Sequence, residues 1–589
     1  MLTTLAAPAF AGTWYIENGD ITVKASDTGN NVTQNNNTTY GDTNTIITGT
    51  SDTNTVTIDT SKGNVDVTFD DLNIDASSRS EAAMSVTGSG NTTIKLDGDN
   101  HLTGGNGRSG IDSIGNLTIY GGENDSLTAK GGSGADGSGG DGIHSGSLTI
   151  YGGTVNANGG NCGDGNYSDG GSGIYSDSGD VTISGGSTVT AKGGDGGSFG
   201  GGSGISSFNR VAISGSTVTA NGGDSSSNSG GYGISSLDVA ISSGTVTANG
   251  GDSKDGSGGN GIYSSSGVAI SGGAVTANGG DSKDGSGGNG IYSSGGVTIS
   301  SGSTVTANGG DGEDGSGGRG ITSNGGVTVS GGTVNAKGGS GKNGNGGDGI
   351  RSFNPVAISG GTVNANGGNS DYSNGGDGIR SLDHVAISGG TVKSNGGSGN
   401  LSGGNGIISY DIDLSGSLEL TAKAGSPNGK ALSRVGSELD LNTIKDKLDP
   451  GAKVTATDAD GKVIQQVSIP RPVEPEEPSS SSDSGSATPS APASFLPGLT
   501  VTDKDGQRIS YTSIRGNNVL SLSVGRFTAS LHASLSTLRQ LRAEGIETIT
   551  FQTILCSTTL SVDELLAMGG EDAEAVLTHR FTVSSLTVG

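Results

Sequence analysis

Three consecutive segments of the chain carry closely spaced acidic residues in almost the same pattern. They read GGDSKDGSGGNGI at 250–262, the same letters at 279–291, and GGDGEDGSGGRGI at 309–321. Equivalent positions hold Asp252, Asp281 and Asp311 and, three residues later, Asp255, Asp284 and Asp314. Carboxylates are the hard oxygen ligands that Ca²⁺ prefers, and like charges on neighbouring repeats repel. We therefore expect these six aspartates to bind calcium; the alternative is a solvated acidic loop that Lys254 and Lys283 partly neutralise.

A second set of residues has the chemistry of a sugar-binding surface. Tyr175, Tyr263 and Tyr292 each follow a Gly-Ile pair directly, and Arg351 and Arg380 hold the same position in later repeats. A sugar ring offers CH groups to the face of an aromatic ring and hydroxyl groups to flanking polar side chains. We expect these five residues to bind carbohydrate. The alternative is that exposed tyrosine simply suits a β-strand.

Composition and charge exclude several classes of protein. The chain has 589 residues, of which 117 are glycine, and its 58 acidic and 31 basic residues give a net charge of −27. Such an acidic surface repels phosphate backbones, which argues against nucleic-acid binding. No run of about 18 apolar residues occurs, so no transmembrane segment is expected. This much glycine without a collagen period indicates a disordered chain or a repeat solenoid.

A recurring Gly-Ile pair decides between these two. Its isoleucines are spaced 28 to 32 residues apart, at Ile111, Ile143, Ile174, Ile205, Ile234, Ile262, Ile291, Ile321, Ile350, Ile379 and Ile407. Within one repeat, residues 261–264, 268–273 and 274–280 form three short segments that alternate apolar and polar residues. Such strands cannot form a core alone, but stacked about 4.8 Å apart they would form a continuous one. We predict an all-β fold, a right-handed parallel β-helix with three strands and about 29 residues per coil, plus a small C-terminal α+β domain.

Alternation along the repeat also assigns side chains to the inside of the helix. Ile262, Val268, Ile270, Val275 and Ala277 should face the core. The Gly-Gly pairs after the strands should adopt positive φ at the corners of the coil. The asparagine that precedes many of these pairs should hydrogen-bond from rung to rung.

Changes in composition predict the organisation of the chain. Residues 1–11 resemble the end of a signal peptide with the cleavage pattern Ala9-Phe10-Ala11, which predicts secretion. The other predicted parts are an N-terminal cap with irregular first coils (12–110), regular repeats (111–430), a C-terminal cap (431–469), a Pro/Ser/Glu linker (470–497) and an α+β module (498–589).

The α+β module carries the helix signals of the chain. Leu535, Leu538 and Leu541 follow helical spacing, and a capping box from Ser561 to Glu564 predicts a second short helix. We expect this module to attach the protein to a cell surface or to a protein partner.

The repeat as a whole resembles a known family. It reads GI-x-S…V-x-I-S-G-G-T-V-x-A-x-G-G and follows TWYIENGDITV, VTFDDLNID and IKLDGDNHLTGG. Over about residues 13–430 it resembles the secreted carbohydrate-binding domain β-helix proteins of anaerobic Gram-positive bacteria, which are similar in fold to pectate and other polysaccharide lyases. The resemblance implies binding of plant cell-wall polysaccharide such as cellulose or polygalacturonate (pectin), with calcium in the β-helix and no catalysis as a class feature.

The sequence thus predicts a secreted, non-catalytic, calcium-assisted polysaccharide-binding protein, with two alternatives. One is a lyase-like enzyme, because Arg351 and Arg380 stand beside Asp348 and Asp377 on adjacent coils, and lyases of this fold combine calcium with a basic residue. The other is a structural surface stalk or adhesin whose repeats only supply length.

Overall fold

The computed structural model describes most of the chain as two separate units. Described are residues 11–471, apart from 136 and 164–167, and 499–588, apart from 504–505, 510, 516–517, 525–527, 554–556, 569–572 and 581–582. The units are Met1–Val473 and Glu474–Gly589. All of the predicted signal segment except Ala11, and the predicted linker except residues 470–471, lie outside the described residues.

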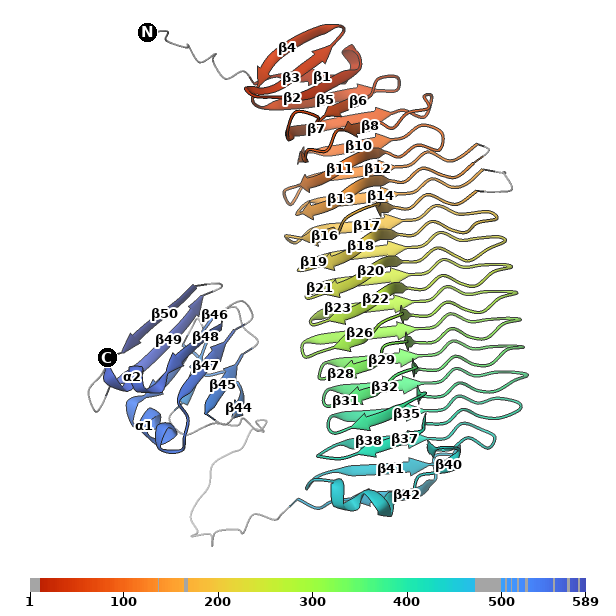
Figure 1. Ribbon diagram of the computed structural model, residues 1–589, viewed down its shortest axis with the longest axis vertical. Coiled ribbons are helices and arrows are strands. Elements are labelled where there is room, and N and C mark those ends of the chain that lie inside the picture. Colours follow the sequence, from red (N-terminus) through yellow and green to blue (C-terminus); the bar gives the residue numbers. More distant parts are fainter. Residues whose placement is uncertain are drawn as a thin grey trace, which may run out of the picture. The chain divides into compact units, whose positions relative to one another are not determined.

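The first unit is the predicted right-handed parallel β-helix, with about 17 turns of about 29 residues (Figure 1). In one coil β22 (Ile262–Ile270) covers the first two strand segments and β23 (Gly273–Asn278) the third. The next coil has β24 (Ile291–Ser293), β25 (Val297–Ile299) and β26 (Ser303–Asn308). The coils pair in parallel register, with each Gly-Ile isoleucine beside the next.

The other coils repeat this arrangement. Strands that begin at the Gly-Ile pair are β11 (Ile111–Tyr120), β13 (Ile143–Tyr151), β15 (Ile174–Ser176), β18 (Ile205–Ile213), β20 (Ile234–Ile241), β27 (Ile321–Ser323), β30 (Ile350–Ser352), β33 (Ile379–Ser381) and β36 (Ile407–Ser409). Separate second strands are β16 (Val181–Ser184), β28 (Val327–Val329), β31 (Val356–Ile358), β34 (His384–Ile387) and β37 (Asp411–Leu414). Third strands are β12 (Ser126–Lys130), β14 (Thr154–Asn158), β17 (Thr188–Lys192), β19 (Ser216–Asn221), β21 (Gly244–Asn249), β29 (Thr333–Lys337), β32 (Thr362–Asn366), β35 (Thr391–Asn395) and β38 (Glu419–Lys423).

The core is a column of small aliphatic side chains, as alternation predicts. All five inward residues predicted for the coil at 262–277 are at most 2% exposed. The serine two residues after each Gly-Ile isoleucine is also buried. In the coil that begins at Ile262, its hydroxyl completes the corner. Ser264 Oγ donates to the carbonyl oxygens of Gly267 (2.9 Å) and Leu237 (2.7 Å).

Both ends of the column are closed. At the N-terminal end β2 (Ile21–Ser26), β3 (Gly29–Gln34) and β4 (Asn37–Asp42) pair antiparallel. Further N-terminal strands are β1 (Thr13–Tyr15), β5 (Thr45–Ser51), β6 (Val56–Asp59), β7 (Val65–Asp75), β8 (Met84–Thr87), β9 (Thr92–Asp97) and β10 (Asp99–Thr103). At the C-terminal end the covering elements are β39 (Leu432–Arg434), β40 (Ser437–Glu438), the 3₁₀ helix η2 (Leu441–Lys447), β41 (Lys453–Thr457) and β42 (Val463–Ser468).

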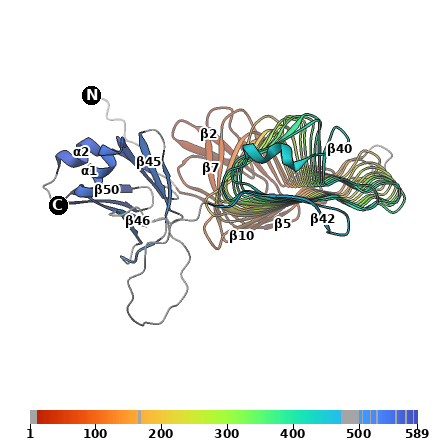
Figure 2. The same ribbon diagram turned by 90° about the horizontal axis from the view of Figure 1, so that it is seen from below.

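A glycine-rich extension projects from one edge of the β-helix in each regular coil (Figure 2). In one coil it is residues 250–261, which run outward from the third strand and return to the next Gly-Ile pair. Backbone hydrogen bonds join it in two directions: Gly250 N donates to Asn278 O of the next coil, and Gly259 N donates to Gly251 O of the opposite layer (both 2.8 Å). The extension is therefore held by backbone, with glycine at the layer contacts.

These glycines correct one expectation. Positive φ is found at Gly273 (78°), at the corner before the third strand, as predicted. It is not found at Gly279 and Gly280, after the third strand. Glycine is needed there for close approach: a Cβ on Gly280 would lie 2.0 Å from the Gly251 carbonyl oxygen. The asparagine ladder is confirmed, since Asn278 Nδ2 donates to Asn249 Oδ1 at 2.8 Å.

The second unit is α+β, as predicted. One sheet contains β43 (Leu499–Thr502), β46 (Thr528–Ser534), β49 (Glu574–Arg580) and β50 (Val583–Val588). The other contains β44 (Thr512–Arg515), β45 (Val519–Ser523), β47 (Thr548–Gln552) and β48 (Ser557–Ser561). The helices are α1 (Leu535–Ala543), with its three predicted leucines buried, and α2 (Val562–Ala567), capped by the Ser561 side chain. No helix in the described ranges is long and apolar enough to span a membrane.

The glycine contacts generate a stability prediction. Gly280→Ala should lower the free energy of unfolding by about 1–3 kcal/mol, because the new methyl group must displace a neighbouring backbone. The matched control is Gly137→Ala in an earlier extension, where an added Cβ meets nothing within 4 Å. Thermal and urea unfolding followed by circular dichroism measure both. Equal losses in the two variants would contradict the packing role of Gly280.

Candidate functional site

A long concavity of the β-helix lies where the returning half of the extension meets the strand after Gly-Ile. Two cavities of about 380 and 260 Å³ lie end to end there and share Ser316, Gly317 and Arg319. We call this continuous groove the trough. Its side-chain lining includes Tyr232, Tyr263, Tyr292, Asn260, Asn289 and Ser257 in one half, and Arg319, Asp348, Arg351, Asp377, Arg380 and Asn405 in the other.

Tyrosines line the first half of the trough as a stack. Tyr263 lies 4.9 Å from Tyr232 and 5.4 Å from Tyr292 between ring centroids, with interplanar angles of 8° and 3°. The repeat pattern does not mark Tyr232, because it stands two residues before its Gly-Ile isoleucine instead of one after. Since both faces of Tyr263 are covered by its neighbours, the predicted stacking of a sugar on its face is wrong. The stack offers ring edges and hydroxyl groups.

Tyr175 lies outside this stack. Its ring contacts His144 of the preceding coil at 5.3 Å, and two coils with serine at the same position separate it from Tyr263. His144 Nδ1 in turn lies 3.1 Å from Asp112 Oδ1. Tyr175 therefore belongs with His144 in a separate group, and Tyr263 and Tyr292 lie on adjacent coils.

Asparagines form the floor beside the tyrosine stack. Asn289 donates to Asn260 Oδ1 through both its backbone N (2.8 Å) and its side-chain Nδ2 (2.9 Å). Arg319 N and the Thr322 hydroxyl then donate to Asn289 Oδ1, both at 3.1 Å. This ladder fixes amide groups at rung spacing along the trough.

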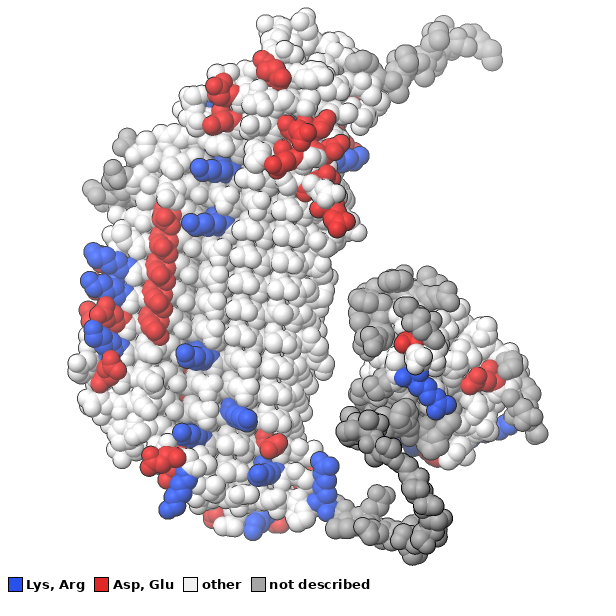
Figure 3. All heavy atoms as spheres, turned by 180° about the vertical axis from the view of Figure 1, so that it is seen from behind, with Lys and Arg blue, Asp and Glu red and all other residues white. Residues whose placement is uncertain are grey.

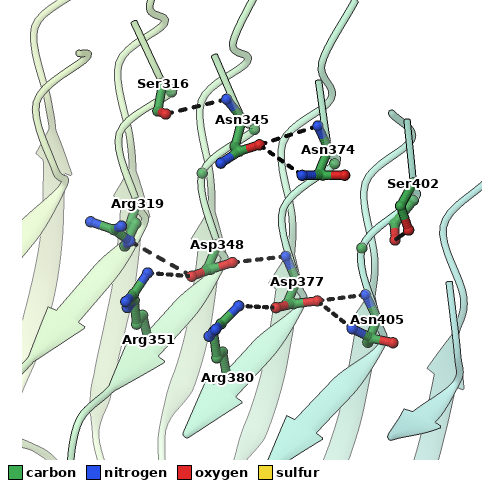
Figure 4. Close-up of a pocket in the computed structure, with 16 residues that line it drawn as sticks. Ser316, Arg319, Asn345, Asp348, Arg351, Asn374, Asp377, Arg380, Ser402 and Asn405 are labelled. Carbon is green, nitrogen blue, oxygen red and sulfur yellow. Dashed lines mark hydrogen bonds and ion pairs between the residues drawn. The ribbon is translucent and has the colours of Figure 1, made fainter. Parts of the chain in front are cut away.

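Arginines and aspartates line the second half (Figure 4). Arg351 and Arg380 lie in register on β30 and β33, as predicted. Arg351 Nη1 is 3.7 Å from Asp348 Oδ2, and Arg380 Nη1 is 3.2 Å from Asp377 Oδ2. Arg319 Nε also reaches Asp348 Oδ2, at 3.6 Å. Three guanidinium groups therefore face two carboxylates, which leaves positive charge in an otherwise acidic protein.

Hydrogen bonds position the two carboxylates, and burial shifts the pKa values of Asp377 and Arg351. Asp348 Oδ1 accepts a hydrogen bond from Asp377 N (2.9 Å), and Asp377 Oδ1 accepts two from Asn405. Burial, and then the charge of Asp348, raise the pKa of Asp377 to about 6. Burial, and then the neighbouring Arg319, lower the pKa of Arg351. Among described residues, the Nε atoms of Arg351 and Arg380 are buried and lack a hydrogen-bond partner, so the accessible donors of these side chains are their terminal nitrogens.

The first predicted calcium residues lie on the outward half of the extension. Asp252, Asp281 and Asp311 follow one another in a straight acidic column (Figure 3). In each, Oδ1 accepts the backbone N–H of the equivalent residue in the next coil, at 2.8 Å for Asp252 and 2.7 Å for Asp281. Burial and the charges of neighbouring aspartates raise the pKa of Asp252.

The second set lies further out on the extension. Asp255, Asp284 and Asp314 are exposed; Asp255 pairs with Lys254 at 3.7 Å, and Asp314 accepts from Asn343 Nδ2 at 2.6 Å. Within the part of the chain that the structure describes, no three His, Cys, Asp or Glu side chains form a group able to hold a metal ion. Calcium binding by the six aspartates stays a prediction.

No family model, curated protein or solved structure matches this chain. The function is therefore inferred from the geometry and chemistry of the trough.

The buried carboxyl of Asp377 generates a pH prediction. The folded protein holds this proton up to a pH of about 6, whereas an unfolded aspartate releases it near 3.8. Between these values the folded state binds more protons, so the free energy of unfolding should fall as the pH rises. Asp377→Asn keeps an oxygen for Asn405 and should make this fall smaller. Urea unfolding at pH 4, 5, 6 and 7 measures the free energy of unfolding of both proteins. If it falls equally with pH in the wild type and in Asp377→Asn, Asp377 is not a buried, protonated group.

Proposed function

We propose that the protein binds polysaccharide along the trough. The observation that carries the proposal is the continuity of the trough, in which two cavities join across successive coils and each presents polar groups at rung spacing, tyrosine and asparagine in one half and arginine and aspartate in the other. A linear polymer also repeats its hydrogen-bonding groups at a fixed interval. A repeating surface can therefore engage several of its residues at once, and the weak contacts add along the chain.

The lining suits hydroxyl-rich ligands. Asparagine amides, tyrosine and serine hydroxyls and guanidinium groups are donors and acceptors for sugar hydroxyls, and the positive excess at Arg319, Arg351 and Arg380 favours polymers that carry carboxylates. The trough is only partly apolar, so orientation would come from hydrogen bonds. Cellulose and pectin are the polymers that the sequence resemblance implies, and we propose plant cell-wall polysaccharide as the ligand class.

Two further parts of the proposal concern calcium and location. Calcium, if bound by the acidic column, would lie on the outward half of the extension and support the fold there, away from the tyrosines. The signal-like start and the acidic surface support secretion, with the second unit as the contact to a cell surface or protein partner. If no glycan binds, the protein would be a structural stalk whose repeats only supply length.

Lyase activity is the second candidate, favoured by one observation. Arg351 and Arg380 line the trough in register on adjacent coils, so one guanidinium group would hold a uronate carboxylate while its neighbour stands beside the proton to be removed. Elimination breaks the glycosidic bond and leaves a carbon–carbon double bond in the new chain end. Such ends absorb in the ultraviolet, so a steady rise in absorbance with polygalacturonate would identify an enzyme, and its absence would leave a binder.

The binding proposal is tested on the full chain against soluble and insoluble cellulose, xylan and pectin, with calcium and with chelator. We expect binding, and Tyr263→Phe should weaken it about 3- to 10-fold, because one hydroxyl of the trough is lost while the ring stack stays. Tyr120→Phe is the control, since Tyr120 contacts only the ring of Tyr151 among described aromatic side chains and does not line the trough. Affinity electrophoresis and sedimentation with the insoluble polymers measure both.

Three results distinguish the accounts. Loss of polysaccharide binding in the presence of chelator would support the calcium prediction. Equal binding with calcium and with chelator would show that binding does not require calcium. Absence of binding to every polymer would contradict the proposal and leave the stalk.

A further inference from the structure

A third cavity, of about 260 Å³, continues the trough at its C-terminal end and differs from it in chemistry. It is lined by Arg380, Leu382, Ile408, Tyr410 and Val435, with Ser381, Ser409 and Gly436. We infer that this cavity is a terminal subsite, which holds the sugar ring at one end of the bound polysaccharide against Tyr410. This inference rests on the proposed function and adds to it: the protein would recognise chain ends.

The cavity is continuous with the trough through Arg380. The Arg380 side chain lines both, and Ile408 is its register partner on the next coil. Along this one position of the repeat the side chain therefore changes from Tyr292 through Thr322, Arg351 and Arg380 to Ile408. A polymer that follows the trough passes from polar and charged contacts to an apolar end.

Tyr410 supplies a free aromatic face, which Tyr263 in the middle of the stack lacks. Its side chain is 66% exposed, and among described residues no other ring contacts it. Leu382 and Ile408 beside it are half-buried, so the CH face of a sugar ring would cover apolar surface that water now wets. The Arg380 guanidinium at the rim can donate to the hydroxyl or carboxylate groups of the same sugar.

Val435 indicates that the cavity wall has a purpose besides folding. It stands with Gly436 in the two-residue turn between β39 and β40, and its φ of 48° is a left-handed conformation that β-branched residues avoid. Asparagine or glycine is the usual residue there. Val435 is 70% exposed, so packing in the free protein does not explain it. An unfavourable backbone with an apolar side chain on a cavity wall is typical of a binding site.

The position of this turn explains why a chain end should bind. Val435 and Gly436 come from the coil after Tyr410 and line the cavity. Beyond them the cap of η2 (Leu441–Lys447) and β42 (Val463–Ser468) covers the end of the core. The regular extension, which forms one wall of the trough, does not continue past this coil (Figure 1). The polymer would therefore end in this cavity.

The test uses the full chain and hexasaccharides from cellulose, xylan and polygalacturonate, measured by isothermal titration calorimetry. We expect a hexasaccharide to bind and Tyr410→Ala to weaken it at least 10-fold. Val435→Asn should weaken it about 3- to 10-fold while the thermal midpoint stays or rises, because asparagine tolerates this backbone. Tyr40→Ala, at an exposed tyrosine (73%) in the N-terminal cap, is the control and should bind like the wild type.

The outcomes separate this inference from the proposed function. If Tyr410→Ala and Val435→Asn bind like the wild type while Tyr263→Phe is weakened, the terminal subsite is wrong and the trough stands. The subsite is equally overturned if polymers bind and no hexasaccharide does, or if Tyr410→Ala changes only self-association, which would make the cavity a contact between copies. If neither polymer nor hexasaccharide binds the wild type, the proposed function itself fails.

Discussion

The structure depends on one packing constraint: two layers of backbone meet in the extension with no room for a side chain between them. An added Cβ on Gly250, Gly279 or Gly309 would lie 2.0 Å from a carbonyl oxygen of the opposite layer. Only glycine allows this approach. Because the layers come so close, backbone hydrogen bonds join one layer to the other as well as each coil to the next. The high glycine content is thus a requirement of packing, and the usual association of such composition with flexibility does not apply.

This constraint also decides where chemistry can occur. Because the layer contacts of the extension are glycine, its functional side chains stand at its base and along its outer surfaces. On the returning half they form the trough, with tyrosine, asparagine and arginine at successive rungs. On the outward half they form the acidic column of Asp252 and its equivalents. One thin wall therefore separates a surface with excess positive charge from a strongly negative one.

Much of the fold was predictable from sequence, because a regular repeat shows which residues of successive coils lie next to one another. The Gly-Ile spacing identified the coils, and alternation placed residues such as Ile262 and Val268 inside correctly. Site geometry was harder. Tyr263 and Tyr292 were recognised as neighbours, but nothing in their spacing says that parallel rings one rung apart cover each other's faces. Tyr232 and Tyr410 were missed because they leave the shared position of the repeat, and Val435 because its strain is a property of the backbone angle alone.

The central claim, that polysaccharide binds in the trough, is tested most directly by amide hydrogen exchange of the full chain with and without a bound polymer. The account predicts added protection on the returning half of the extension and the strands after it, at 286–292, 316–322, 345–351 and 374–380. Exchange at the acidic column, around Asp252 and Asp281, should stay as in the free protein. Protection confined to the acidic column or to the second unit would contradict it.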